Sequence, residues 1–373
     1  MWHTYRRGAT SAAAVITFPA PTTDEEIVDA TGAPVILAGV NWFGFETDTH
    51  VVHGLWARGY DQYLDQIADL GYNTIRLPWS VAAIRSSTTS SINGSAGANA
   101  DLVGKTPLEV MDVIIEAAAE RGLLVLLDNH RLNDQQIPEL WYGDGYTEAD
   151  WIDAWTDLAE RYADEPNVIG ADLKNEPHGP ATWGTGDLAT DWRLAAERAG
   201  NAVSAIAPHW LIVVEGIGGS VAGQQLPGHW WGGNLEGARS APVRLDVPNK
   251  LVYSPHEYGP GVHDQAWFDS PDLEATLRHR WDVGFAYLAE EGIAPVLVGE
   301  FGGKEVGLDT VEGRWQNLFV DFLAERGTSW TYWSWNPNSS DTGGILRDDW
   351  TTVHPAKQAM LDRLLAAVPP PPV

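Results

Sequence analysis

Short apolar runs recur along the chain, each separated from the next by a longer segment. Eight such runs lie at 35–39, 73–77, 123–127, 168–173, 211–214, 251–253, 296–298 and 329–333. Their apolar character is continuous and does not alternate with polar residues, as is typical of parallel strands that are covered on both faces. The repetition therefore predicts a parallel sheet whose connections cover it.

Most of the connecting segments have the period of an amphipathic helix. Tyr60, Tyr63, Leu64 and Ile67 form one apolar stripe, and the segment 106–109 opens the next helix with a capping box and a proline in the first turn. The other helices are expected at 151–162, 187–206, 272–288, 311–323 and 355–365.

Strands that alternate with helices eight times favour a (β/α)₈ TIM barrel in the α/β class. The rival fold is a doubly wound open sheet, which normally carries a glycine-rich phosphate loop after its first strand. The stretch 39–44, Gly-Val-Asn-Trp-Phe-Gly, lacks that pattern. We therefore expect a single barrel domain with elaborated loops at its C-terminal face.

The 373 residues are enough for this one domain, which we place at 31–367. Residues 1–30 form a poorly defined N-terminal segment, in which two arginines at 6–7 precede a short apolar stretch at 12–18. This arrangement resembles a partial export signal, and we expect a secreted, extracellular protein. The proline-rich tail at 368–373 is expected to be a stub of a linker.

Composition excludes several classes of function. The net charge of −28 repels nucleic acid and anionic membranes, and no run approaches the roughly 18 apolar residues of a membrane span. With no cysteine, the chain has no disulfide, thiolate zinc site or cysteine nucleophile. A neutral polymer remains compatible, and 19 tryptophans indicate a groove with aromatic platforms on which sugar rings stack.

Polar and aromatic residues follow every predicted strand. Because active sites of TIM barrels are built at the carboxyl ends of the strands, these residues should meet on one rim. They are Asn41-Trp42, Arg76, Asp128-Asn129-His130, Asn175-Glu176-Pro177-His178, Glu215, His256-Glu257-Tyr258, Glu300-Phe301-Gly302 and Trp333-Ser334-Trp335.

Two carboxylates on this rim, Glu176 and Glu300, suit the hydrolysis of a glycoside. That reaction needs one carboxyl group to protonate the leaving oxygen and a second one to attack the sugar or activate water. A separation of about 5–5.5 Å predicts retention of the anomeric configuration, and about 6.5–9.5 Å predicts inversion. The company of Arg76, His130 and His256 favours an active site over two solvated loop carboxylates.

Longer motifs make the chain recognisable. It resembles glycoside hydrolase family 5, also called cellulase family A, and in particular its bacterial endo-β-1,4-glucanase branch. The resemblance extends over nearly the whole length from about residue 35. It rests on GVNWFGFET (39–47), VVHGLW (51–56), LGYNTIRLPWS (70–80), DLKNEPHG (172–179), DWRLAAERAGNAV (191–203), WWGGNLEGA (230–238), VPNKLVYSPHEYGP (247–260), VLVGEFGG (296–303) and YWSWNPNSSDTGGILRDDW (332–350).

The resemblance implies a retaining reaction through a covalent glycosyl-enzyme. Glu176 would be the general acid/base and Glu300 the nucleophile. Arg76 would hydrogen-bond the nucleophile and keep it ionised, as a fixed cation beside a carboxylate does. Asn175 would contact the 2-hydroxyl of the sugar at the cleavage site, and Tyr258 would hydrogen-bond Glu300.

The resemblance also implies the walls of the site. His130 and His256 would line the pocket, and Trp333 would form the platform under the sugar on the non-reducing side. Trp42 and Trp231, which stand in glycine-flanked motifs beside loops, are expected in the substrate groove. Neither a metal nor another cofactor is expected, because the histidines form no convincing ligand spacing.

The catalytic glutamates do not separate an endoglucanase from a mannanase, a xylanase or a β-glucosidase of the same family. The long matched stretches favour a β-glucan polysaccharide as substrate and partner, for an enzyme expected to be a monomer. An inactive glycan-binding barrel would show damage at a catalytic position, and none is found. A barrel enzyme that acts on phosphates would need a glycine-rich anion-binding loop after the seventh or eighth strand, and the segment 301–304 matches such a loop only weakly.

The sequence departs from this branch in the loop 181–186, Ala-Thr-Trp-Gly-Thr-Gly. Threonines stand there where relatives often carry a cysteine pair, so the loop loses a cross-link. The catalytic motif beside the loop is intact.

Overall fold

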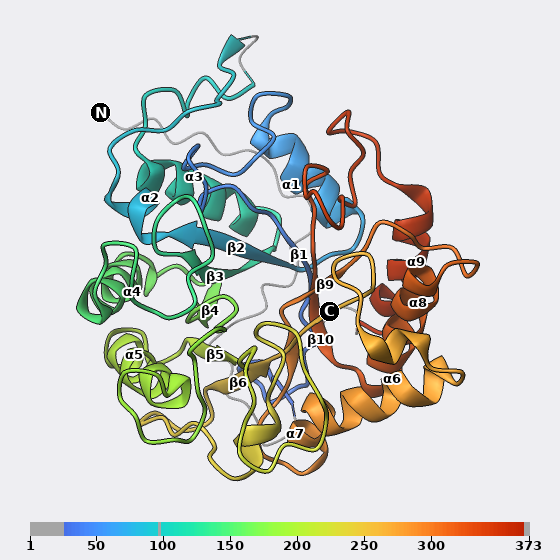
Figure 1. The fold of residues 1–373 in the computed structure, drawn as a ribbon. Coiled ribbons are helices and arrows are strands. Elements are labelled where there is room, and N and C mark those ends of the chain that lie inside the picture. Colours follow the sequence, from blue (N-terminus) through green and yellow to red (C-terminus); the bar gives the residue numbers. More distant parts are fainter. Residues whose placement is uncertain (1–25, 96–97, 369–373) are drawn as a thin grey trace.

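The computed structural model describes residues 26–95 and 98–368. Within these ranges eight parallel strands form one sheet in the order β6-β5-β4-β3-β2-β1-β10-β8. A parallel bridge between Tyr253 and Val296 joins the two ends of the sheet. Figure 1 shows the strands at the centre and the helices around them. The predicted (β/α)₈ barrel is confirmed.

The strands lie within a few residues of the predicted runs. Because both faces of the sheet are covered, nearly all of their residues are buried. The barrel strands are β1 (Ala38–Asn41), β2 (Thr74–Ser80), β3 (Leu124–Arg131), β4 (Val168–Asp172), β5 (Leu211–Glu215), β6 (Leu251–Ser254), β8 (Leu297–Val298) and β10 (Ser329–Tyr332).

Two further short strands were not predicted. β7 (His256–Tyr258) follows β6 and β9 (Glu300–Gly302) follows β8, and these two strands pair in parallel. His256 stands opposite Glu300 in this pairing. The sixth and seventh strand segments thus extend past the rim of the barrel and bring two polar side chains of the site together.

Helices surround the sheet, and the capping box at Thr106 and Glu109 is present as predicted. The predicted helix 272–288 consists of α6, a π-helical turn (Asp282–Ala286) and α7. The helix predicted from residue 187 begins at Trp192, and α2 was not predicted. The α-helices are α1 (Tyr60–Asp69), α2 (Val81–Arg85), α3 (Pro107–Ala119), α4 (Glu148–Tyr162), α5 (Trp192–Ile206), α6 (Leu273–Trp281), α7 (Tyr287–Glu290), α8 (Val311–Arg326) and α9 (Pro355–Leu365).

The expected alternation of strands and helices is interrupted between β5 and β6. The connection 216–250 between β5 and β6 contains only a 3₁₀ turn, Glu236–Arg239, and no α-helix. Its eight glycines and three prolines disfavour a helix. Leu235, Ala238 and Val243 are buried all the same, so the loop itself covers this side of the barrel.

An apolar cluster fills one end of the barrel interior. On β3 its members Leu124 and Leu126 alternate with Val125 and Leu127, which pack in the separate core between sheet and helices. Because successive side chains of a strand point to opposite faces, this cluster lies inside the barrel. We call it the inner apolar cluster: Ile27, Leu37, Leu124, Leu126, Ile169, Leu211, Val213, Val252 and Leu297.

None of the helices in the described ranges is long and apolar enough to cross a lipid bilayer. The export signal expected at 6–18 lies outside the described residues, as does nearly all of the proline-rich tail.

Candidate active site

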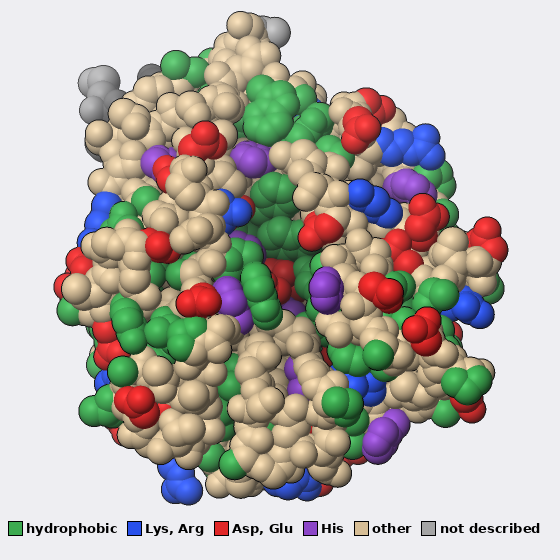
Figure 2. All heavy atoms as spheres, viewed as in Figure 1, with side chains coloured by type: hydrophobic (Ala, Val, Ile, Leu, Met, Phe, Trp, Pro, Cys, Tyr) green, Lys and Arg blue, Asp and Glu red, His purple; other side chains and the backbone are tan. Residues whose placement is uncertain are grey.

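A cavity of about 630 Å³ is lined by residues that follow the strands, including Glu176, Glu300 and Trp333. Figure 2 shows the corresponding face of the molecule, with a central hollow in which acidic, hydrophobic and histidine side chains gather. Five residues of the predicted rim therefore meet at one depression that is large enough for sugar rings: His130, Glu176, Tyr258, Glu300 and Trp333.

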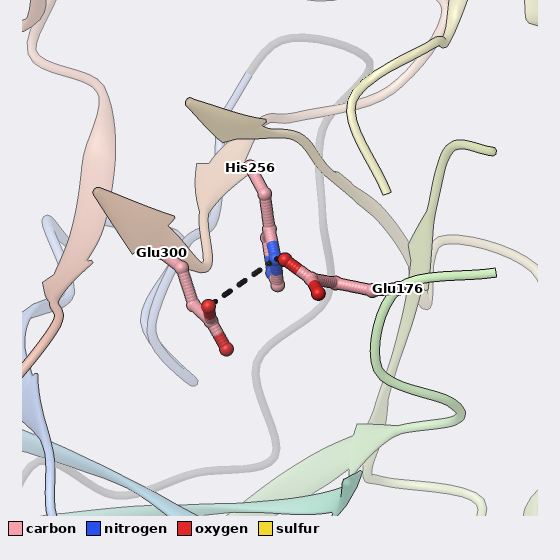
Figure 3. A group of neighbouring side chains, drawn as sticks. All are labelled: Glu176, His256 and Glu300. Atoms are coloured by element: carbon pink, nitrogen blue, oxygen red, sulfur yellow. Dashed lines mark hydrogen bonds and ion pairs between the residues drawn. The ribbon is translucent and has the colours of Figure 1, made fainter. Parts of the chain in front are cut away.

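The two predicted carboxylates face each other across this depression. Glu176 follows β4, and Glu300 lies on β9. One oxygen of each and one ring nitrogen of His256 all lie within 4.8 Å of one another (Figure 3). This upper limit of 4.8 Å on the distance between the two oxygens fits the roughly 5–5.5 Å of retaining glycosidases and lies below the roughly 6.5–9.5 Å of inverting ones.

Glu300 is held by donors on both of its oxygens. Arg76 Nη1 lies 2.7 Å from Oε1, and the Tyr258 hydroxyl donates to Oε2 at 2.6 Å. Burial alone would raise the pKa of Glu300, but the positive charges of His256 and Arg76 outweigh it and hold that pKa below its ordinary value. Glu300 is therefore ionised, as a nucleophile must be.

Glu176 has the opposite electrostatic setting. Burial raises its pKa to about 7, and the neighbouring negative charge of Glu300 adds to this effect. A hydrogen bond to His256 Nδ1 at 3.1 Å opposes the rise without cancelling it. Two carboxyl groups with separated pKa values provide one proton donor and one anion in the same site.

Arg76 joins the buried carboxylates beneath the cavity. Its guanidinium contacts Asp128, Asp172, Glu215 and Glu300 at 2.7–3.1 Å, and its side chain is fully buried. Asp128, Asp172 and Glu215 are spaced closely enough to share a metal ion. Each of them already contacts Arg76, so the guanidinium supplies the positive charge at this place.

His256 is the second cation of the site. Burial would lower its pKa, but Glu215 at 3.2 Å and Glu300 at 3.5 Å raise it well above the ordinary value. The imidazolium therefore lies between the two catalytic candidates and beside a third carboxyl group.

Asn175 and His130 complete the polar wall. The Asn175 side-chain oxygen accepts from Arg76 Nη2 at 3.0 Å, while its buried Nδ2 has no partner among the described residues. That nitrogen is free to donate to a substrate hydroxyl. His130 Nδ1 lies 2.7 Å from Asp128 Oδ2 and 4.0 Å from Glu300 Oε1.

Two of the three predicted tryptophan platforms line the cavity. Trp333 stacks on His130 and on Phe43, with ring centroids 5.2 Å apart in both pairs. Trp231 is 50% exposed and stacks on His178.

The prediction for Trp42 is wrong. Its side chain is fully buried, donates to the His53 carbonyl oxygen and packs edge-on against Tyr63. Its neighbour Phe43 lines the cavity instead. Adjacent residues of an extended segment point to opposite sides, so only one of the two can face the groove.

The loop 181–186 is held by hydrogen bonds. The hydroxyl oxygens of Thr182 and Thr185 lie 2.9 Å apart. The carboxylate of Asp191 accepts from the backbone N–H groups of Gly184 and Gly186. The loop is thus cross-linked by polar contacts.

Sequence reasoning missed Asp172 and Phe43, and it placed His178 on the rim without assigning it a role. The signal for Asp172 was a charged residue inside an otherwise apolar run, which requires a buried partner. That partner is Arg76.

Comparisons with known proteins find relatives over most of the chain. Residues 28–339 match the family model described as cellulase (glycosyl hydrolase family 5). An endoglucanase of Paenibacillus polymyxa is 51% identical over 348 residues, which cover 93% of this chain and 87% of the relative. The major extracellular endoglucanase of Xanthomonas campestris pv. campestris is 47% identical, with 91% and 69% covered.

Solved structures show the same likeness. The catalytic domain of the Xanthomonas campestris pv. campestris endoglucanase superimposes with a TM-score of 0.87 at 45% identity, covering 93% of this chain and 99% of that one. An endocellulase of Pyrococcus horikoshii in complex with cellotetraose gives a TM-score of 0.87 at 42% identity, covering 95% and 100%.

Proposed function

The chain belongs to glycoside hydrolase family 5 and is an endo-β-1,4-glucanase, and from this premise we propose that Glu176 and Glu300 cleave the glucan with retention of configuration. The observation that carries the proposal is the pair of facing carboxyl groups, one kept protonated by burial and one kept ionised by cations.

The reaction proceeds in two displacements. In the first, the Glu300 carboxylate attacks the anomeric carbon, the glycosidic C–O bond breaks, and Glu176 gives its proton to the departing oxygen. In the second, Glu176 takes a proton from water as the water oxygen attacks the anomeric carbon. Glu300 leaves as a carboxylate and Glu176 is again protonated.

The surrounding residues support these steps. Arg76 and Tyr258 fix both oxygens of the nucleophile, and His256 bridges the two carboxyl groups. The unpartnered Nδ2 of Asn175 donates to the sugar hydroxyl beside the reacting carbon. His130 stacks on Trp333 and supports its indole ring.

The substrate is a β-glucan chain that crosses the cavity. Two aromatic faces line the same cavity as the carboxyl pair: Trp333, which stacks on His130, and Trp231, which stacks on His178 next to the Glu176 backbone. Two platforms in one cavity support the binding of several consecutive sugar rings of a polymer. We further propose that residues 31–367 act as a monomeric catalytic domain and that the protein is extracellular; the name of the Xanthomonas relative describes that enzyme as extracellular.

Azide rescue of two alanine variants tests the proposal. In Glu300→Ala, azide takes the place of the nucleophile and should give a glycosyl azide of inverted configuration. In Glu176→Ala, azide attacks the glycosyl-enzyme and should give a product of retained configuration. Both products are distinguished by NMR with an aryl cellobioside as substrate. Rescue with the same configuration in both variants, or in neither, contradicts the assignment.

Product release from carboxymethylcellulose, mixed-linkage glucan, xylan and mannan tests the substrate. Preferential formation of short oligosaccharides from the two glucans is expected. Faster cleavage of mannan or xylan would reassign the specificity while leaving the mechanism intact.

A further inference from the structure

Glu176 sits in an uncommon backbone conformation. Its φ is +51°, in the left-handed region that residues other than glycine rarely adopt. Its N–H donates to Glu215 Oε2 at 2.7 Å, and its carbonyl oxygen lies 2.7 Å from Nδ1 of His178. Gly232 leaves room for this arrangement, since a Cβ there would meet Glu215 Oε2 at 2.4 Å. The backbone of Glu176 is therefore held by hydrogen bonds at both its N–H group and its carbonyl oxygen.

His178 provides one of these two contacts as a neutral donor. A carbonyl oxygen only accepts, so the hydrogen of the imidazole must reside on Nδ1. Burial lowers the pKa of His178, which keeps the ring uncharged. The backbone N–H of His178 donates to the Glu139 carbonyl oxygen, which holds the main chain of His178 in place.

The same imidazole ring supports the exposed platform. His178 and Trp231 stack with centroids 3.7 Å apart and planes inclined by 5°. A Cβ at Gly218 would meet Trp231 Cδ1 at 2.8 Å and His178 Cβ at 3.0 Å, so a glycine is needed for the stack to form. One side chain thus touches both the indole of Trp231 and the peptide of Glu176.

We propose that His178 is a positioning residue that couples sugar binding on Trp231 to the orientation of the proton donor Glu176. This inference rests on the proposed function, because it takes Glu176 as the general acid. An acid must contact the oxygen that departs, so the leaving-group sugar lies on the side of Glu176, where Trp231 stands. A sugar stacked on Trp231 restrains the indole, the imidazole beneath it and the carbonyl that the imidazole holds.

Two variants separate the two contacts of His178. His178→Phe keeps a flat ring under Trp231 but removes the donor to the Glu176 carbonyl. His178→Asn keeps an N–H donor near the position of Nδ1 but removes the ring. Both are assayed on aryl cellobiosides with good (2,4-dinitrophenyl) and poor (phenyl) leaving groups, and on cellopentaose.

Loss of acid positioning has a kinetic signature. In His178→Phe, kcat/KM for the phenyl glycoside should fall about tenfold or more, while the 2,4-dinitrophenyl glycoside, which departs without a proton, should change less than about threefold. An equal loss on both aryl substrates would reduce His178 to a structural residue and overturn the proposal.

Coupling through the stack is measured with Trp231→Ala, a substitution at an exposed site. On cellopentaose this substitution should lower kcat of the parent enzyme. In the His178→Asn background, the factor by which it lowers kcat should be at least about threefold smaller. Additive effects would overturn the coupling. Glu176→Gln is the reference for the underlying function. If it shows no dependence on the leaving group, the proposed function fails, and this outcome is distinct from a failure at His178.

Discussion

The interior of the barrel has two halves built from the same strands. Along β3 the inward positions run from Leu124 and Leu126 to Asp128, and along β5 from Val213 to Glu215. All five side chains are buried. The amino half is apolar and the carboxyl half is ionic, although neither is in contact with bulk solvent.

The two halves contribute differently to the protein. The inner apolar cluster stabilises the fold because burial of apolar surface is favourable in itself. The carboxylates around Arg76 lose hydration on burial, and such clusters are rarely more stable than apolar replacements. Their value lies in the pKa values that they impose on Glu176 and Glu300. Substitutions in the two halves should therefore have separable effects on activity and on stability.

The largest difference between the effect on activity and the effect on stability is expected for Glu300→Gln. The glutamine keeps the shape of the side chain but is not a nucleophile, so activity on carboxymethylcellulose should fall by about 10³-fold or more. The melting temperature measured by circular dichroism should stay within a few degrees of the parent. Glu325→Gln, on the outer surface, is the matched control and should retain full activity. Substantial activity in Glu300→Gln would remove this residue from the mechanism.

Arg76→Met should affect both properties. It leaves Asp128, Asp172, Glu215 and Glu300 without their shared cation, and breaking a buried ion pair costs about 3–5 kcal/mol of unfolding free energy. Urea titrations measure this loss. Arg278→Met is the control, because its pair with Glu325 is largely exposed and should contribute less than about 1 kcal/mol.

The deficit of Arg76→Met should also depend on pH. Without the guanidinium, the buried carboxyl groups have pKa values raised above those of the unfolded chain, so the folded state binds protons more strongly. The stability of the variant is then greatest at low pH and is lost as the pH rises through those values. A deficit that is constant between pH 5 and 8 would show that Arg76 acts by packing and not by charge.

Leu126→Ala tests the apolar half. Removal of this buried side chain should reduce the free energy of unfolding by about 2–5 kcal/mol, because a cavity is left in a closely packed layer. The kcat on cellopentaose at 25 °C should remain within about twofold. Leu308→Ala is the control, since that side chain is 68% exposed. A large fall in kcat without loss of stability would abolish the distinction between the two halves.

The smallest effect concerns the pH profile of kcat/KM. Glu176 must be protonated, and its pKa of about 7 places the basic limb there, with about a tenfold fall per pH unit above it. Glu300 must be ionised, and its lowered pKa places the acidic limb below the ordinary carboxyl range. Glu176→Gln should lose the basic limb. A basic limb that persists in this variant would assign it to another group, of which His256 is the nearest.

Most of the fold could be predicted from the sequence because each barrel strand coincides with an apolar run. Continuous apolar runs located all eight barrel strands, and helical periodicity located most helices. The rim could be predicted because the carboxyl ends of parallel strands converge. Glu176 and Glu300 needed only this convergence, together with the motifs around them.

What the sequence missed depends on burial and tertiary partners. Trp42 and Phe43 are adjacent aromatic residues, and only the packing around them decides which one faces the cavity. The pairing of β7 with β9 involves three residues on each strand, too few for a period. The role of His178 depends on its contact with Trp231, a residue 53 positions away in the chain.

The helix-free connection 216–250 has a consequence for how such enzymes diversify. It carries Trp231 and the wall beside Glu176, yet it contributes no strand to the sheet and no α-helix to the outer shell. We expect that its exchange as one cassette between relatives, with the buried Leu235, Ala238 and Val243 retained, would alter which leaving groups are accepted. Recombination at its two glycine- and proline-rich ends is thus a direct way to engineer product profiles.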